Sequence, residues 1–321
     1  MKNVLIKSAI ATAVIAATTV TTIADTKVYG RVRLAAVCAD DGTTDDCGLQ
    51  NGSSRFGIKA SHEISDGLTA FGHYEFGVDA DVGRIGNADK TTNRLSYVGV
   101  KGGFGEVSLG ARWSPMYNYI TGPIDPNNYI GGTSNNGVGY ASSFRRADTV
   151  NYKNKFGPAA MHVQLVMADG DAGNDAVDEF QIGGSFKAGM VDLGLAYQDT
   201  TDVGSVIGVH GGAKVGPVGV GVSYYDVSTD TGVSTINGKH EGGTVYGNLN
   251  FGFGSGMSVD LGIGTDMPDA SGAPEPMVVA LEFNHKLSKE YSWGAAVSNT
   301  DLDVAGADDV VQYGVGMRYD F

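Results

Sequence analysis

Five arginines carry most of the chemistry that this sequence offers. All five lie in the first half of the chain, in or beside segments whose residues alternate between polar and apolar types: Arg31, Arg33, Arg55, Arg94 and Arg145. A guanidinium group keeps its proton throughout the physiological pH range, so it supplies fixed positive charge and hydrogen bonds rather than acid or base catalysis. Several such charges on one polar face could create an electric field across a water-filled space.

The alternation assigns these arginines to the polar face of their segments. Arg94 is placed there because Leu95 and Tyr97 occupy the apolar parity next to it. Glu75 has polar parity in its own segment, and we predict that it pairs with one of the arginines. An alternative stays open, in which the arginines only form internal ion pairs that hold the shape of the protein.

Other chemical motifs are weak. The six histidines show no metal-ligand spacing, and no Gly-x-Ser-x-Gly nucleophile motif occurs in the chain. The glycine pairs Gly183–Gly184 and Gly211–Gly212 are not followed by the Lys-Ser/Thr of a phosphate-binding loop. We therefore predict no catalytic residue and no cofactor, and we interpret the glycine pairs as bends or places of close packing.

The elements that must position the arginines are strands, because strict alternation is the main periodic signal of the chain. The last segment shows it most clearly, with Val311, Tyr313, Val315, Met317, Tyr319 and Phe321 on one parity. Similar segments recur from residue 28 onward. We count about 16 of them, each roughly 10–12 residues long, which is the length that a tilted strand needs to cross a bilayer.

The connections between these segments also follow a pattern. Short turns rich in Gly, Asp or Ser, such as 65–67 and 254–256, alternate with longer polar loops. The longer loops lie near 37–52, 80–91, 114–146, 168–178, 199–205, 227–243, 266–276 and 299–309. Brief periplasmic turns and extended outer loops are typical of outer-membrane β-barrels.

A secreted β-sandwich would alternate too, but sandwich strands are typically about 5–6 residues long. Aromatic residues also gather near the ends of the segments, where a membrane barrel has its interfacial girdles. They are Tyr29, Phe71, Tyr74, Phe76, Tyr97, Trp113, Trp293, Tyr319 and Phe321. The sequence therefore favours an all-β fold, a 16-stranded antiparallel transmembrane β-barrel.

The start of the chain has the build of a cleavable signal peptide. Lys2 and Lys7 precede an apolar run of about 12 residues, too short for a membrane-spanning helix, and small residues end it before Asp25. We predict a signal peptide over 1–24, export of the chain and a barrel over 25–321. Cys38 and Cys47, the only cysteines, would form a disulfide in an oxidising compartment; a metal pair is the weaker interpretation.

Charge narrows the class of partner. The net charge is −14, and removal of Lys2 and Lys7 leaves −16, which argues against binding to nucleic acid. Most surplus acidic residues lie in the long loops and would concentrate cations at an outer mouth. On this basis we expect a mild cation preference. The acidic loops could also bind Ca²⁺, although solvated loops are the simpler interpretation.

At the level of motifs the chain resembles the general porins of Gram-negative bacteria. The resemblance rests on the stretches 27–33, 54–59 and 67–79, on 94–101 running into 104–113, and on the terminal Tyr-Asp-Phe. It implies a 16-stranded barrel, usually a homotrimer in outer-membrane lipid, whose long third loop folds into the lumen. It also implies that Phe321 serves as an assembly signal.

The third loop is where this chain departs from the family pattern. Loop 114–146 lacks the acidic Pro-Glu-Phe-Gly-Gly-Asp form, and Asp125 is its only carboxylate between Trp113 and Arg145. We predict that Asp125 faces the arginines and Glu75 across the pore constriction.

These features together predict a general diffusion porin, a passive water-filled channel for ions and small hydrophilic solutes in the bacterial outer membrane. The alternatives are a sugar-specific channel, an outer-membrane hydrolase and a plugged structural barrel. A sugar channel would need a line of aromatic residues along the lumen, and only Tyr225 and Tyr246 have polar parity. A hydrolase would need a convergent Ser/His/Asp set, which the sequence does not offer.

Overall fold

The computed structural model describes residues 25–86, 93–125, 144–167, 176–236 and 239–321. The predicted signal peptide, 1–24, and most of the third long loop, 126–143, lie outside the described residues. No helix in the described part of the chain is both long and apolar enough to cross a membrane.

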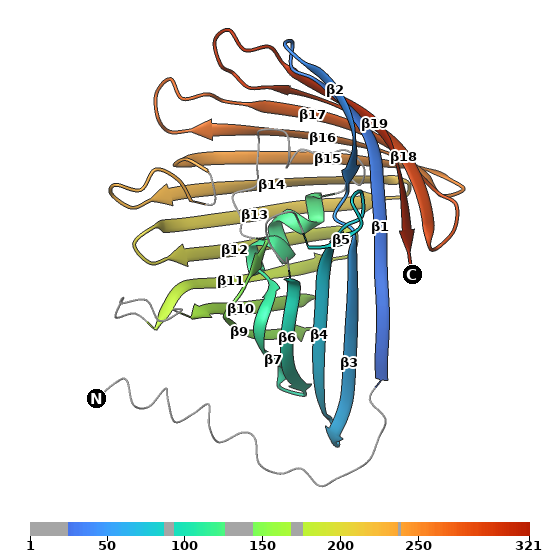
Figure 1. The fold of residues 1–321 in the computed structure, drawn as a ribbon. Coiled ribbons are helices and arrows are strands. Elements are labelled where there is room, and N and C mark those ends of the chain that lie inside the picture. The colour runs from blue at the N-terminus through green and yellow to red at the C-terminus, as the bar shows by residue number, and fades with distance from the viewer. Residues whose placement is uncertain (1–24, 87–92, 126–143, 168–175, 237–238) are drawn as a thin grey trace.

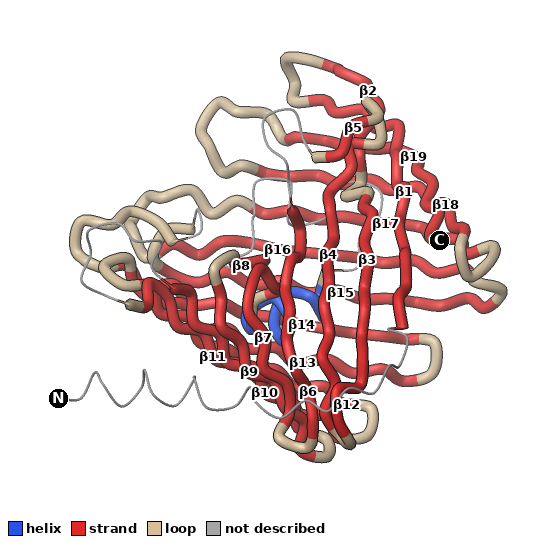
Figure 2. Tube along the Cα trace, turned by 60° about the horizontal axis from the view of Figure 1, so that its bottom comes forward, coloured by secondary structure: helices blue, strands red, loops and turns tan. Residues whose placement is uncertain are grey.

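Within these ranges, sixteen long antiparallel strands form one closed barrel (Figures 1 and 2). The first eight are β1 (Asp25–Asp40), β3 (Arg55–Ser65), β4 (Leu68–Asp79), β6 (Asn93–Gly102), β7 (Gly105–Trp113), β9 (Thr149–Phe156), β10 (Ala159–Met167) and β11 (Val177–Ala188). The last eight are β12 (Val191–Thr200), β13 (Gly204–Val215), β14 (Val218–Thr229), β15 (Gly242–Gly254), β16 (Met257–Pro268), β17 (Met277–Lys286), β18 (Tyr291–Asp301) and β19 (Val310–Asp320). Three shorter strands lie in the long loops: β2 (Asp45–Asn51), β5 (Arg84–Ile85) and β8 (Arg145–Arg146).

The barrel closes between its first and last strands. β1 pairs with β19 from Arg31 opposite Asp320 to Asp40 opposite Val311, so every long strand has two neighbours. Closure matters in a bilayer because an open sheet edge would leave backbone N–H and C=O groups without partners in hydrocarbon. The predicted barrel and its sixteen strands are confirmed.

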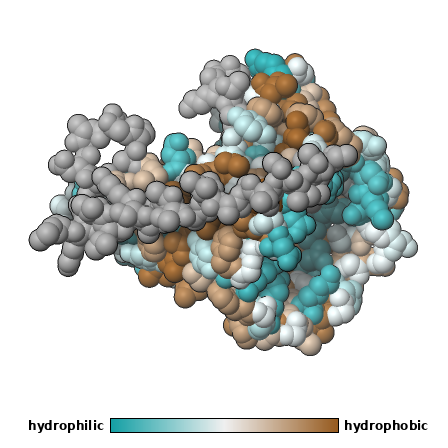
Figure 3. All heavy atoms as spheres, turned by 90° about the horizontal axis from the view of Figure 1, so that it is seen from below, coloured by the Kyte–Doolittle hydropathy of each residue, from teal (hydrophilic) through white to brown (hydrophobic). Residues whose placement is uncertain are grey.

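Alternation along each strand separates an apolar outside from a polar inside. In β19, Val315 is 58% exposed and Met317 62% exposed, whereas the alternate residues Gly314, Gly316 and Arg318 are small or charged. The inward parities of β10 and β11 place buried polar side chains such as His162, Gln164 and Gln181 in the interior. Figure 3 shows apolar residues spread over the visible wall and polar residues gathered around a hollow.

The predicted aromatic girdle is wrong for four of its nine members. The Tyr29 hydroxyl donates to Glu75 at 2.7 Å, and the Tyr97 hydroxyl bonds His73 at 2.8 Å. Phe71 packs against Tyr97, and Trp113 packs against the third loop. These rings lie in the interior with charged residues. Three of them occupy inward-facing positions of their strands, and Trp113 directly precedes the loop that folds inward. Tyr74, Tyr319 and Phe321 do lie on the outer surface.

Beyond the barrel wall, the upper part of β1 forms a hairpin with β2. Cys38 lies opposite Cys47 in this pair, and a disulfide joins them. The bond ties the two strands next to the first long loop.

Candidate pore constriction

The first part of the third long loop lies against the inner wall of the barrel. After β7 the chain forms two short helical turns, η1 (Tyr117–Thr121) and η2 (Gly122–Ile124), which contact β11 to β15. Ser223 donates to the Ile120 carbonyl at 2.8 Å, and the Thr121 and Tyr225 hydroxyls lie 2.6 Å apart. Figure 1 shows these turns inside the ring of strands. The described start of this loop therefore narrows the lumen from one side.

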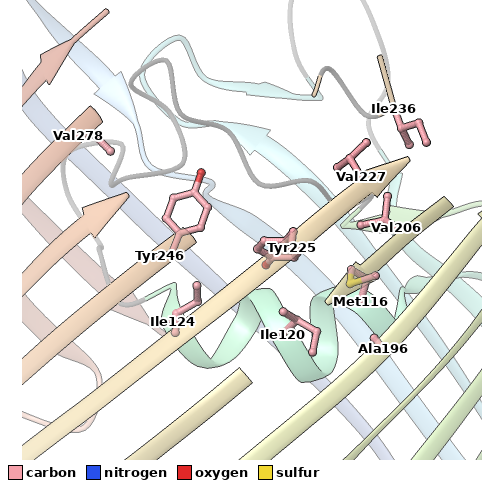
Figure 4. Packing of buried hydrophobic residues seen from close by; sticks show 10 residues of the cluster. All are labelled: Met116, Ile120, Ile124, Ala196, Val206, Tyr225, Val227, Ile236, Tyr246 and Val278. Atoms are coloured by element: carbon pink, nitrogen blue, oxygen red, sulfur yellow. The ribbon is translucent and has the colours of Figure 1, made fainter. Parts of the chain in front are cut away.

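An apolar cluster holds the loop in place. Met116 and Ile120 are fully buried, and Ile124 is nearly so. They pack against inward residues of the wall and of a neighbouring loop: Ala196, Val206, Tyr225, Val227, Ile236, Tyr246 and Val278 (Figure 4). Burial of a side chain of this size stabilises by about 1.5–3 kcal/mol relative to exposure. Apolar residues inside a barrel whose other inward residues are mostly polar thus act as an anchor for the loop.

Glycines on the inner wall make the close approach of the loop possible. A Cβ atom at Gly194 would lie 2.2 Å from the Tyr119 carbonyl oxygen, and one at Gly208 would lie 2.6 Å from the Met116 sulfur. Gly183 similarly faces the Tyr119 ring at 3.0 Å. For Gly183, close packing was one of the two interpretations drawn from the sequence, and the loop is what packs there.

The arginine side of the lumen begins at the junction of β1 and β19. Arg31 Nε lies 2.8 Å from Asp320 Oδ1, and Arg318 Nε lies 2.7 Å from Asp320 Oδ2. Asp320 therefore joins two arginines of neighbouring strands. Next to them, the Arg33 side chain donates to the Gly52 carbonyl. Arg318 and Asp320 have polar parity in the last segment, a signal that could have assigned them to the site.

Glu75 is the hub of the adjoining group. Its carboxylate accepts from Arg94 Nε at 2.8 Å and from the Tyr29 hydroxyl at 2.7 Å, and Arg55 approaches it at 4.0 Å. Glu75 is 4% exposed, so the carboxylate is held in one position by charged and neutral donors together. The arginines of this group thus have a fixed geometry rather than that of free surface side chains.

Arg94 reaches the lumen by a route that the alternation did not predict. Leu95 is buried and Tyr97 bonds His73, so both lie inside rather than on the outer face. The register between β4 and β6 shifts between Glu75 opposite Leu95 and Phe76 opposite Asn93. Arg94 is the extra residue of this β-bulge, and a bulge re-aims a side chain that parity alone would send outward. The parity argument for Arg94 was wrong, although its side chain does point inward.

Arg145 is placed by an aromatic stack. Its guanidinium carbon lies 4.7 Å from the centroid of the Trp113 ring, and that ring stacks on Tyr117 at 4.1 Å. A cation over the face of an indole ring is attracted by the ring's quadrupole. Arg94 lies over the same ring at 5.8 Å. Trp113 and Tyr117 therefore connect the arginine wall to the loop, a role that sequence reasoning missed.

Asp125 follows η2 and faces the arginines from the loop side. Its side chain is solvent-exposed, and its carboxylate experiences the Arg33 charge and accepts a hydrogen bond from Tyr117. Arg33 in turn experiences the charges of Arg31, Arg318, Glu282 and Asp125. All seven residues proposed from the sequence lie in this region: Arg31, Arg33, Arg55, Glu75, Arg94 and Arg145 along one wall, with Asp125 opposite Arg33.

A closed barrel of sixteen strands, with apolar residues outside, charged residues inside and a loop against its inner wall, is an outer-membrane β-barrel. The chain belongs to the Gram-negative porin family, whose profile matches residues 11–321. This membership places the protein in the bacterial outer membrane, where its family forms channels.

Relatives and solved structures agree with the family. A monosaccharide porin from a Halomonas species is 34% identical over 151 residues, covering 43% of this chain and 41% of the relative. The chain thus spans about two fifths of the length of that curated relative. The anion-selective porin from Comamonas acidovorans has the same fold, with a TM-score of 0.75 and 18% identity over 93% of this chain and all of that one. OmpF of Salmonella typhi is similar, with a TM-score of 0.72 and 14% identity over 92% of this chain and 97% of that one.

Proposed function

We propose that this protein is a general diffusion porin, a passive, water-filled and non-enzymatic channel for ions and small hydrophilic solutes. The observation that carries the proposal is the charged constriction between the arginine wall and the loop turns η1 and η2. Arginines and carboxylates that face each other across water create a transverse field, which favours polar solutes over apolar ones. No proton transfer or bond cleavage is needed for this function.

The proposed constriction consists of Arg31, Arg33, Arg55, Glu75, Arg94, Asp125 and Arg145, to which the geometry adds Arg318 and Asp320. Within the described residues, six arginines here are accompanied by four carboxylates, those of Glu75, Asp125, Glu282 and Asp320. The arginines outnumber the carboxylates, so we propose that the constriction prefers anions. The acidic outer loops favour cations at the mouth, as the sequence suggested, but the narrowest part of a pore has the larger effect because charges act there at the shortest distance.

A sugar-specific channel is the second candidate, and the lumen argues against it. Tyr225 is fully buried and Tyr246 is 1% exposed, because the apolar cluster of the loop covers both rings. They are therefore unavailable as a surface along which a sugar could slide. The matched Halomonas relative is named a monosaccharide porin, which keeps this candidate worth testing.

Liposome swelling separates an open pore from a specific one. Proteoliposomes should swell in isotonic solutions of arabinose, glucose and sucrose at rates that fall with solute size alone. Protein-free liposomes are the control. A swelling rate that saturates with one sugar, while other sugars of the same size enter without saturation, would support the specific channel instead. No swelling with any sugar would indicate a plugged barrel.

We also propose that the channel assembles as a homotrimer. Support comes from the family and from the apolar outer faces of the strands, which a bilayer or a neighbouring subunit can cover equally well. Cross-linking of the protein in native outer membranes should yield a species of three chains that dissociates on boiling. Recovery of single chains only after cross-linking would contradict the proposal.

A further inference from the structure

A second charged region lies at the short-turn end of the barrel, below the loop turns η1 and η2. A cavity of about 860 Å³ opens there. Asn118, Tyr119 and Pro123 of the loop line it on one side, and residues beside the turns between β6 and β7 and between β9 and β10 line the other. Four lysines border the cavity: Lys101, Lys153, Lys155 and Lys187.

The carboxylates of this cavity are already engaged. Glu106 lies 2.5 Å from an Arg112 nitrogen, and Asp192 lies 2.9 Å from Lys187 Nζ. Among the described residues, Lys101, Lys153 and Lys155 have no carboxylate within ion-pair distance. Glu106 lies directly opposite Lys101 and Lys153 on the neighbouring strands, so the three ammonium groups share one water-filled space with a single carboxylate that Arg112 already engages.

Lysines and exposed carboxylates lie mainly at opposite ends of the barrel. Apart from Lys239 and Lys59, which lies near the middle of β3, the lysines in the described ranges lie in the short-turn half of their strands or in the short turns: Lys27, Lys101, Lys153, Lys155, Lys187, Lys214, Lys286 and Lys289. The opposite end carries exposed carboxylates, among them Asp41, Asp46, Asp303 and Asp308. Because short turns are periplasmic in this fold class, the positive end faces the periplasm.

The geometry points to this cavity as a binding site for small multivalent anions that enter from the periplasm, with inorganic pyrophosphate as the probe. An ammonium group is a compact point charge that binds phosphate oxygens without demanding one orientation. Three or four such groups around one space attract a multivalent anion far more than a monovalent one, since each charge pair adds its own Coulomb term. The inference goes beyond the proposed function, because this site lies below the constriction and shares none of its residues.

A planar-bilayer experiment tests the site through its sidedness. In about 0.1 M KCl, where charges are screened beyond about 10 Å, pyrophosphate is added to one chamber at a time and the current is recorded. The outer end is identified with a Ser271→Cys protein, whose exposed cysteine is labelled with an impermeant maleimide polymer from one chamber. We expect concentration-dependent block from the periplasmic chamber and at least fivefold weaker block from the outer one, where the acidic loops repel the anion.

A pair of matched variants assigns the block to the lysines. Lys101→Gln/Lys155→Gln removes two exposed lysines of the cavity, and Lys286→Gln/Lys289→Gln removes two exposed lysines of the same rim that do not line it. The cavity variant should raise the half-blocking concentration by about fivefold, from two screened Coulomb interactions in water. The rim variant should leave it unchanged.

Equal block from both chambers, or an equal response of the two variants, would overturn the proposal. Titration calorimetry of pyrophosphate with the detergent-solubilised protein provides a readout that needs no channel. A protein that conducts no ions but binds pyrophosphate through Lys101 and Lys155 would contradict the proposed function and leave this site standing. A protein that conducts ions but shows neither sided block nor pyrophosphate binding would contradict this site and leave the proposed function standing.

Discussion

The double replacement Arg55→Ala/Arg94→Ala is expected to reduce the preference of the channel for anions. Both side chains converge on the Glu75 carboxylate, so their removal takes two positive charges from the constriction and leaves one negative charge without its ion-pair partners. The chloride-to-potassium permeability ratio should fall by about threefold or more, from two screened charges at a few ångströms from the ion path. The reversal potential in a tenfold KCl gradient measures this ratio.

Two further variants make this result specific. Arg84→Ala removes an exposed arginine of β5 outside the constriction and should leave the reversal potential unchanged. Arg55→Lys/Arg94→Lys keeps the charge and should retain most of the anion preference, although lysine cannot reproduce the guanidinium geometry. An unchanged permeability ratio in the alanine variant would mean that these arginines serve only as internal ion pairs that hold the barrel in shape.

Gly194→Ala is expected to loosen the loop from the wall and widen the pore. The new Cβ atom would lie 2.2 Å from the backbone carbonyl of Tyr119, and a backbone atom cannot move aside alone. Overpacking of this kind costs about 1–3 kcal/mol. We therefore expect a larger single-channel conductance, with more frequent fluctuations, and a lower temperature of the heat-induced shift in gel mobility.

Gly211→Ala on the next strand is the matched control. Gly211 has outward parity, and an added Cβ would meet nothing closer than 4.0 Å. An alanine in an unstrained strand position usually stabilises slightly, because it restricts the unfolded chain. Equal conductance in the two variants would show that the packing of the loop on Gly194 does not control the width of the pore.

The local parts of this structure could be predicted from the sequence. Alternation with period two is a property of each strand by itself, because successive side chains point to opposite faces. β19 therefore shows its outward and inward residues in its sequence, and the same reasoning applied to the other segments yields sixteen strands and a closed barrel. Arg31, Arg33 and Arg55 follow their parity into the lumen for the same reason.

The site could be predicted only in part, since its geometry depends on neighbours that are distant in sequence. Arg94 points inward because of a bulge against β4, and parity would have sent its side chain outward. Tyr225 and Tyr246 have the parity expected of a sugar track, yet loop residues cover them. Asp125 was chosen as the only acid of its stretch, but its position opposite Arg33 depends on how η1 and η2 pack on the wall.

The sequence by itself thus determined the barrel, its arginine-bearing face and a candidate acidic partner on the third loop. Tertiary structure alone decided how the lumen is divided. Wall glycines and an apolar cluster hold the third loop against one side of the barrel, and Glu75 and Trp113 position the arginines on the other side. The physical reason is that alternation reports only which face a residue occupies. The distance between opposite faces is set by packing across the lumen, which no single strand encodes.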